Sequence, residues 1–243
     1  MIYLDHAAHT PLDDQVARAM RAAAKLGNPH NLSHGAGRAA AAVIGRARAQ
    51  VAHCIGASEA GVTFPSGATE SNNLALFGSV KPGDALAVSA IEHASVRGPA
   101  RELARRGHEV FEVPVDATGR VRIGALREIL QRSPALVSIM WVNNEIGVVQ
   151  DMAAVVAEAH AHGALVHSDA SQAVGRLPIE AEALCIDLLT LSAHKIYGPG
   201  GVGVLWARPG LSLEPLWFGG GQQRGARPGT LDTSGIAGVG EAC

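Results

Sequence analysis

Lys195 is the residue of this 243-residue chain whose position most favours covalent chemistry. It follows residues 186–191, an apolar run that predicts a buried strand, and it precedes residues 198–201, a Gly/Pro turn. Because burial of an ammonium group is costly, a lysine at the mouth of a buried strand loses its charge easily. A neutral amine can form a Schiff base with an aldehyde cofactor, although a lone lysine is more often an ordinary loop residue.

Four further polar clusters follow predicted strands in the same way. They are residues 66–69, residues 92–93, residues 143–145, and Asp169 with Gln172. In open α/β sheets, ligands bind beyond the carboxyl ends of the strands. Together with residues 192–195, these clusters predict one binding site along a single edge of the sheet.

Each cluster has a possible chemical role and an ordinary structural alternative. Residues 66–69 open a predicted helix, whose free N–H groups favour an anion such as phosphate but also suit a plain helix cap. A partly buried Asp169 needs a partner, and a protonated pyridine nitrogen would serve. His93 could lie flat against such a ring. Asn144 and Gln172 could donate to a ring oxygen, or each could simply tie down a loop.

The elements that must position these residues alternate along the chain. Helices are expected near residues 10–26, 37–55, 67–77, 96–106, 123–131 and 151–163, and strands near 62–64, 85–89, 108–113, 135–142, 165–168, 187–192 and 203–207. Thr10 and Pro11 are expected to begin the first helix, and Asp151 to cap the last. This alternation predicts an α/β three-layer sandwich with a mostly parallel sheet.

Two other motifs do not predict a site. Residues 198–203 fit G-x-G-x-x-G, but they lead into a predicted strand, whereas a dinucleotide fingerprint opens a helix. His160, His162, His167 and Asp169 could be taken for a metal cluster. However, His160 and His162 are two apart on a predicted helix and point in different directions, so no metal is expected.

The composition limits the class of protein. The net charge is −2 at pH 7, which argues against nucleic acid as a partner. No apolar run is long enough to cross a membrane, the N-terminus lacks the features of a signal peptide, and the three cysteines form no framework. A cytoplasmic protein is therefore expected, with Cys54 and Cys185 as small buried residues. Aromatic content of 4% within a 47% hydrophobic chain predicts an aliphatic core.

Taken together, these residues resemble the cysteine desulfurases, a family within the class-V aminotransferase group of fold-type-I pyridoxal phosphate (PLP) enzymes. The matching stretches are residues 64–73 (FPSGATESNN), 92–93 (EH), 142–147 (VNNEIG), 167–172 (HSDASQ), 192–199 (SAHKIYGP) and 219–225 (GGGQQRG). Their order and spacing match from about residue 2 onwards.

The resemblance implies a role for each matched residue. Lys195 would form the Schiff base with PLP, Asp169 would pair with the pyridine nitrogen, and His93 would stack on the ring. Gln172 and Asn144 would contact the ring hydroxyl, with Asn144 also near the substrate carboxylate. The phosphate cradle would consist of Ala68, Thr69, Ser192 and His194. Thr230 would reach the cofactor phosphate of a neighbouring subunit, which implies a homodimer.

The resemblance also implies a reaction and a division of the chain. L-cysteine would displace Lys195, which would then remove the Cα proton, and a protein thiolate would take the sulfur as a persulfide while alanine leaves. The sulfur would pass to an acceptor protein, as in iron–sulfur cluster assembly. Residues 1–14 would belong to the small-domain side and residues 15–243 to the large PLP-binding domain, with the small domain largely absent.

Two departures from the family pattern shape the expectation of activity. Family chains continue well beyond Cys243 with a mobile cysteine that accepts sulfur and an arginine that grips the substrate, and no cysteine here stands at that position. Residues 5–10 (DHAAHT) replace a version richer in Asn and Thr. Weak or absent sulfide release is therefore expected. The alternatives are another PLP-dependent lyase or aminotransferase, or a non-catalytic protein that binds PLP or dimerises.

Overall fold

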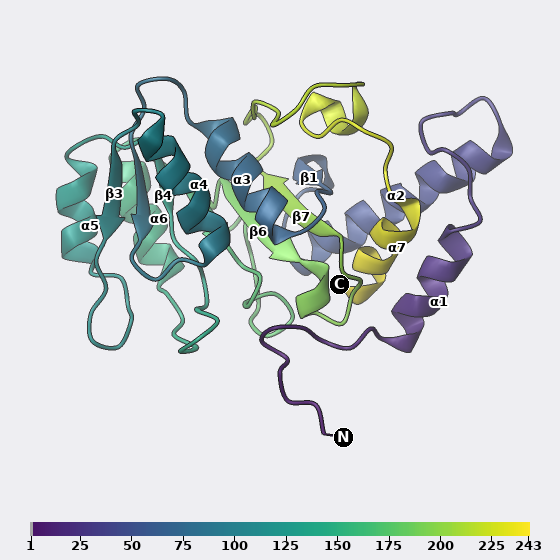
Figure 1. Ribbon diagram of the computed structural model, residues 1–243, viewed down its shortest axis with the longest axis horizontal. Helices are drawn as coiled ribbons and strands as arrows, with labels where there is room; N and C mark the ends of the chain where they lie inside the picture. The colour runs from purple at the N-terminus through teal and green to yellow at the C-terminus, as the bar shows by residue number, and fades with distance from the viewer. Residues whose placement is uncertain (1) are drawn as a thin grey trace.

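Seven strands form a single sheet in the computed structural model, which describes residues 2–243 (Figure 1). The strands are β1 (Val62–Thr63), β2 (Leu86–Ser89), β3 (Val110–Val113), β4 (Leu136–Ser138), β5 (Leu165–Asp169), β6 (Leu188–Ser192) and β7 (Gly203–Ala207). Their order across the sheet is β1-β7-β6-β5-β4-β2-β3. Strand β7 runs antiparallel to both of its neighbours, β1 and β6, and the other four pairs are parallel, so the prediction of a mostly parallel sheet is confirmed.

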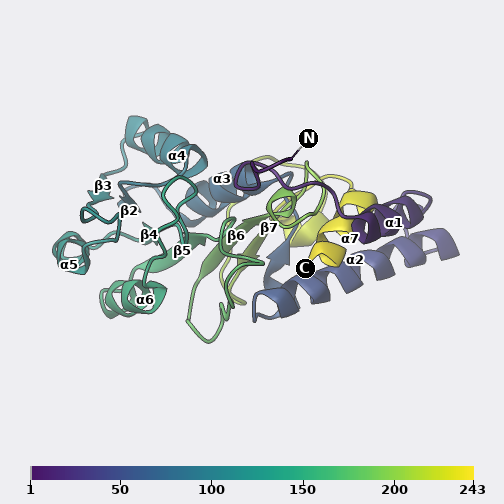
Figure 2. The ribbon, with the colours of Figure 1, turned by 90° about the horizontal axis from the view of Figure 1, so that it is seen from below.

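Helices cover both faces of this sheet. They are α1 (Asp14–Ala23), α2 (Gly35–Cys54), α3 (Ala68–Ser79), α4 (Ala94–Arg105), α5 (Ile123–Leu130), α6 (Met152–Ala161) and α7 (Thr233–Ala242), with short 3-10 turns η1 (Glu59–Gly61), η2 (Ala193–Lys195) and η3 (Gln222–Gly225). Figure 2 shows α3 and α4 on one face and α2, α5 and α6 on the other. The predicted three-layer sandwich is thus confirmed, and α7 packs against both α1 and α2.

The central strands are apolar because both of their faces are covered. Every residue of β2, β4 and β6 is buried, as is typical of parallel strands between two helical layers. Aliphatic residues dominate the two buried clusters, as predicted, although Trp206 of β7 is also fully buried. Asp169 of β5 pairs with Thr190 of β6, so the chain leaves both strands at the same edge of the sheet.

The predicted start of the first helix is wrong. Asp13, rather than Thr10, caps α1, and its Oδ1 accepts a hydrogen bond of 2.7 Å from the N–H of Gln15. The Thr10 hydroxyl instead donates to the carbonyl of His194 at 2.9 Å and accepts from the N–H of Tyr197 at 2.6 Å. Local spacing predicts the Thr10 side chain as a helix cap, but this side chain bonds to the distant segment 194–197 instead. The predicted cap at Asp151 is confirmed, because its Oδ1 accepts from the N–H of Ala154 at 3.0 Å.

Strand β4 is shorter than the predicted residues 135–142. The backbone N–H of Met140 donates to the carboxyl of Glu92 at 2.6 Å instead of continuing the ladder. The N–H of Trp141 still reaches the carbonyl of Asp169 at 3.0 Å, so the segment stays beside β5.

The structure also bears on the predicted burial of the cysteines and on membrane-spanning segments. Cys185 was expected to be buried but is exposed, in a turn where its φ is 56°, and Cys54 is half-buried. Within residues 2–243, no helix combines the length and apolarity that crossing a bilayer requires.

Candidate functional site

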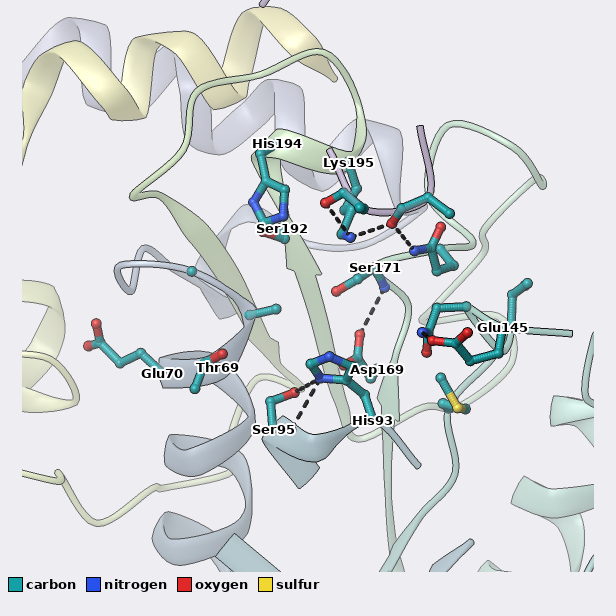
Figure 3. Close-up of a pocket in the computed structure, with 18 of the residues that line it drawn as sticks. Thr69, Glu70, His93, Ser95, Glu145, Asp169, Ser171, Ser192, His194 and Lys195 are labelled. Atoms are coloured by element: carbon teal, nitrogen blue, oxygen red, sulfur yellow. Dashed lines mark hydrogen bonds between the residues drawn. The ribbon is translucent and has the colours of Figure 1, made fainter. Parts of the chain in front are cut away.

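A cavity of about 600 Å³ lies at the carboxyl ends of β1, β2, β4, β5 and β6. The structure brings all five predicted polar clusters to its wall. The predicted residues among those that line it are Ala68, Thr69, His93, Asn144, Asp169, Gln172, Ser192, His194 and Lys195. Figure 3 shows Ser192, His194 and Lys195 along one side of this cavity and His93 and Asp169 along the other, with Ser171 between them.

Lys195 lies in η2, directly after β6. Its Nζ donates to the carbonyls of Ala7 and Ala8, at 2.8 Å for Ala8. Burial and then the nearby positive charge of Arg176 lower the pKa of this amine, while Asp169 acts in the opposite direction. The amine thus loses its proton more readily than an exposed lysine, as its place after a buried strand predicted.

The N-terminus of α3 forms an anion-binding wall of the cavity. Gly67 is its N-cap, with φ 153° and no side-chain cap, so the first N–H groups of the helix are left for another acceptor. Ser192 Oγ and His194 Nδ1 lie 2.8 Å apart at the same cavity. Burial, followed by the charges of Lys195 and His9, lowers the pKa of His194. The N–H of Ser66 is not available, because Glu70 accepts from it at 2.6 Å.

Asp169 provides a buried carboxylate at the end of β5. Only 5% of the residue is exposed. Its Oδ1 accepts from the N–H of Ser171 at 3.0 Å, and its Oδ2 accepts from the side-chain amide of Asn72 at 2.7 Å. Both contacts hold the carboxylate in place without a cation, so it can pair with a positively charged group in the cavity.

His93 is the N-cap of α4, and its ring is held by Ser95. Its Nδ1 accepts from the backbone N–H of Ser95 at 3.1 Å and lies 2.7 Å from Ser95 Oγ. Sequence reasoning missed Ser95 and Asn72. The signal available for Asn72 was a polar side chain on the face of the predicted helix that packs against the sheet, where the residue is fully buried.

Glu92, the neighbour of His93, does not line the cavity. It is 3% exposed, and its Oε1 accepts from the Ser89 hydroxyl and from the N–H of Met140, both at 2.6 Å. Burial raises the pKa of this carboxyl to about 8. Of the predicted pair at residues 92–93, only His93 therefore lines the cavity.

The N-terminal strap, residues 5–10, closes one side of the cavity, and the family resemblance places this segment nearer the substrate or the dimer edge than the cofactor. Asp5, Ala7 and Ala8 line the cavity, and the amide of Gln172 donates to the carbonyl of Ala7 at 2.8 Å. The strap thus contacts both Gln172 and Lys195.

Asn144 lies at the cavity in a contact with its own neighbour. Its side-chain amide donates to Glu145 Oε1 at 2.7 Å.

Thr230 is the one predicted site residue outside the wall of this cavity. It is exposed, in the segment between η3 and α7. Its expected role requires a second copy of the chain and stays a prediction.

The histidine cluster and the glycine-rich residues 198–203 have structural roles. His160 Nε2 lies 2.8 Å from Asp187, whereas His167 lies between Ser138 (2.8 Å) and Thr190 (3.1 Å). Burial lowers the pKa of His167 to about 4. Across residues 2–243, no three or more His, Cys, Asp or Glu side chains gather as a metal ion would require. Residues 198–203 lead into strand β7 and not into a helix.

The sheet order and a cavity with this lysine, carboxylate and helix start define the class of protein. The sequence model for class-V aminotransferases matches residues 2–243, and the chain belongs to that family.

Particular relatives are all similar over nearly the whole chain. The chain is 43% identical to "Cysteine desulfurase IscS" of Serratia proteamaculans over 251 residues, which cover 99% of this chain and 62% of that relative. The chain thus spans less than two thirds of that protein's length. Among solved structures, a "NifS-like protein" has a TM-score of 0.95 at 37% identity, with 99% of this chain and 68% of that one covered. A structure of "SspA in complex with cysteine" has a TM-score of 0.94 at 35% identity, with 100% and 72% covered.

Proposed function

We propose that this chain is a cysteine desulfurase-type polypeptide that binds PLP and acts on L-cysteine. The observation that carries the proposal is the placement of one amine, one buried carboxylate and one uncapped helix start around a single cavity. The names of the relatives, and the cysteine in the SspA structure, support the choice of substrate.

The residues present fit PLP. The cofactor has an aldehyde, a ring nitrogen and a phosphate, for which Lys195, Asp169 and the N-terminus of α3 are chemically suited. Ser171 Oγ is buried at the cavity and has no hydrogen-bond partner within residues 2–243, so it can still bond to a ligand. A cavity of about 600 Å³ has the size of a site for a small cofactor with its substrate.

The mechanism follows from the chemistry of these side chains. When bound, PLP supplies an aldehyde for reversible attachment of amines and a ring that accepts electron density. Lys195, with its lowered pKa, accepts the substrate Cα proton at Nζ. Asp169 would keep a proton at the ring nitrogen, and His93 would cover the ring. Asn144 and Gln172 would orient polar groups, while Ser192 and His194 would hold the phosphate with Ala68 and Thr69.

The remaining parts of the proposal go beyond one chain. We propose a homodimer in which Thr230 reaches the neighbouring site, and a cytoplasmic role in sulfur transfer toward iron–sulfur cluster assembly. Residues 1–14 are assigned to the small-domain side and residues 15–243 to the large domain.

The test of the proposal is the visible spectrum of the chain mixed with PLP. Wild type should gain a visible absorption band that borohydride reduction traps on the peptide containing Lys195. Lys195→Ala should lose the band, whereas Lys25→Ala and Lys81→Ala, which change exposed lysines, should keep it. If saturating PLP gives wild type no band, or if Lys195→Ala retains it, the proposal is wrong.

A second arm of the same experiment identifies the substrate class. Alanine and sulfide released from L-cysteine are measured beside keto acids formed from other amino acids. A trace of alanine and sulfide from cysteine alone supports a desulfurase-type site. Keto-acid formation from another amino acid would instead identify an aminotransferase.

A further inference from the structure

Four side chains form a continuous hydrogen-bonded path from the buried carboxylate to the histidine of the cavity. Asp169 Oδ2 lies 2.7 Å from Asn72 Nδ2, which lies 2.8 Å from Ser95 Oγ, which lies 2.7 Å from His93 Nδ1. We name this path the Asn72 relay. Asn72 is fully buried and Ser95 is 6% exposed, so water does not compete strongly for these bonds.

The charge of Asp169 fixes the orientation of the Asn72 amide. Nδ2 donates to two acceptors, while Oδ1 is buried and has no partner within residues 2–243. A flipped amide would place Oδ1 against the carboxylate oxygen, which repels it. The molecule therefore tolerates an unsatisfied Oδ1 so that Asp169 and Ser95 both receive a hydrogen bond.

This orientation sets the direction of the rest of the relay. Because Ser95 Oγ accepts from Asn72, its own hydrogen is free to point to His93 Nδ1. The backbone N–H of Ser95 donates to the same nitrogen at 3.1 Å. With two donors directed at Nδ1, the ring proton of neutral His93 belongs on Nε2. Within residues 2–243, no side chain or carbonyl hydrogen-bonds to that Nε2, and His93 lines the cavity.

We propose that Asn72 is a positioning residue that couples the two sides of the site. It holds the Asp169 carboxylate and, through Ser95, makes His93 Nε2–H a hydrogen-bond donor for ligands in the cavity. The ligand side of this inference rests on the proposed function, since it concerns how His93 meets PLP and substrate. The tautomer itself is a property of the protein without cofactor.

The experiment compares two isosteric changes on the same helix. Asn72→Asp places a carboxylate where the amide was, so Ser95 Oγ–H turns toward it and leaves His93 Nδ1. Asn73→Asp is the matched control, because the amide of Asn73 donates only to the carbonyl of Thr69, at 2.8 Å, one turn earlier in α3. Both variants replace an amide by a carboxyl group of the same size on the same helix.

The readout is the imidazole ¹⁵N spectrum of cofactor-free protein, with the His93 signals identified by their loss in His93→Gln. Wild type and Asn73→Asp should show the proton on Nε2, whereas Asn72→Asp should shift the tautomer ratio toward Nδ1–H by about tenfold. If Asn72→Asp does not fold, Ser95→Ala decides, because it removes the hydroxyl but keeps the Asn72–Asp169 bond. A smaller shift in the same direction is expected from Ser95→Ala.

Three results would overturn the relay. They are a wild-type ring protonated on Nδ1, a folded Asn72→Asp or Ser95→Ala with the wild-type tautomer, or an equal shift in Asn73→Asp. PLP titration then tests the ligand side, where we expect Asn72→Asp to weaken binding about tenfold and Asn73→Asp to leave it unchanged. Since the tautomer is read without PLP, failure of wild type to bind PLP contradicts the proposed function and leaves the tautomer result standing.

Discussion

At the residue scale, Glu92 is a carboxyl that the fold keeps protonated beside the site. It connects the ends of β2 and β4, since Oε1 accepts from Ser89 and from the backbone of Met140. Its Oε2 is buried without a hydrogen-bond partner within residues 2–243. Burial dominates the pKa of Glu92, which rises from the ordinary 4.5 to about 8, with the charge of Asp169 adding to the rise.

This raised pKa makes stability depend on pH in a defined direction. Between pH 4.5 and about 8, the folded chain binds a proton at Glu92 that the unfolded chain has lost. The contribution of Glu92 to the free energy of unfolding is therefore complete below pH 4.5 and is lost as the pH rises toward 8. Glu92→Gln, which resembles the protonated form, should lack this slope.

Urea unfolding of both proteins at a series of pH values measures the difference, in which all other titrating groups cancel. Parallel curves for wild type and Glu92→Gln across that range would show that Glu92 is ionised in the folded protein.

Residue types near strand ends made Lys195, Asp169 and His93 predictable as cavity residues. Asn72 was not predictable in the same way, because its contacts with Asp169 and Ser95 require α3 to dock on the sheet beside α4. Hydrophobic periodicity indicates which face of a helix is buried, but it does not indicate which polar group of a neighbouring element bonds to a residue on that face.

At the element scale, α7 lies unusually close to α2 and α1. A side chain at Gly240 would meet the backbone of Ala47 in α2, since an added Cβ would lie 2.6 Å from its Cα. A side chain at Gly238 would meet Met20 of α1. Small residues in α7 thus permit a three-helix contact at the β1 end of the sheet.

Substitutions at two glycines test this contact. Gly240→Ala should lower the free energy of unfolding by about 1–3 kcal/mol, because backbone must move to accommodate the methyl group. Gly45→Ala on the exposed face of α2 is the control, since its added Cβ would meet nothing within 4 Å. It should be neutral or stabilising by up to about 1 kcal/mol, because alanine favours helix. Equal effects in urea unfolding would argue against close packing of α7.

The elements themselves were largely predictable, since every predicted strand and helix exists within a few residues of its expected range. Apolar runs and Gly or Pro stops carry that information locally. The predicted bounds were wrong where a hydrogen bond to a distant residue replaced a local one. Glu92 accepts from the N–H of Met140 at the end of β4, and residues 194–197 bond to Thr10 before α1.

At the scale of the whole molecule, the N-terminal strap connects the first residues of the chain to the loop that carries Lys195. Thr10 bonds to His194 and Tyr197, and Tyr197 has a φ of 63°, a conformation that few L-residues adopt. Thr10 is 1% exposed, so water cannot replace its contacts. The strap and the lysine loop therefore stabilise each other.

Removal of the Thr10 hydroxyl should loosen both segments together. Thr10→Ala should lower the free energy of unfolding by about 1–2 kcal/mol, because the N–H of Tyr197 loses its acceptor. Hydrogen exchange should accelerate in residues 2–13 and 192–200. Thr118→Ala is the control, since that hydroxyl bonds to Asp116 in an exposed turn. If hydrogen exchange in either segment of Thr10→Ala is as slow as in wild type, the strap and the loop that carries Lys195 do not stabilise each other.

The strap also dictates when the cavity can be completed during synthesis. Thr10 and the carbonyl that accepts its hydrogen bond are separated by 184 positions, so the strap leaves the ribosome long before its docking place exists. Until β6 and η2 have emerged, the nascent chain has an open entrance and no lysine in position. Ligand capture consequently has to wait until translation has passed Lys195.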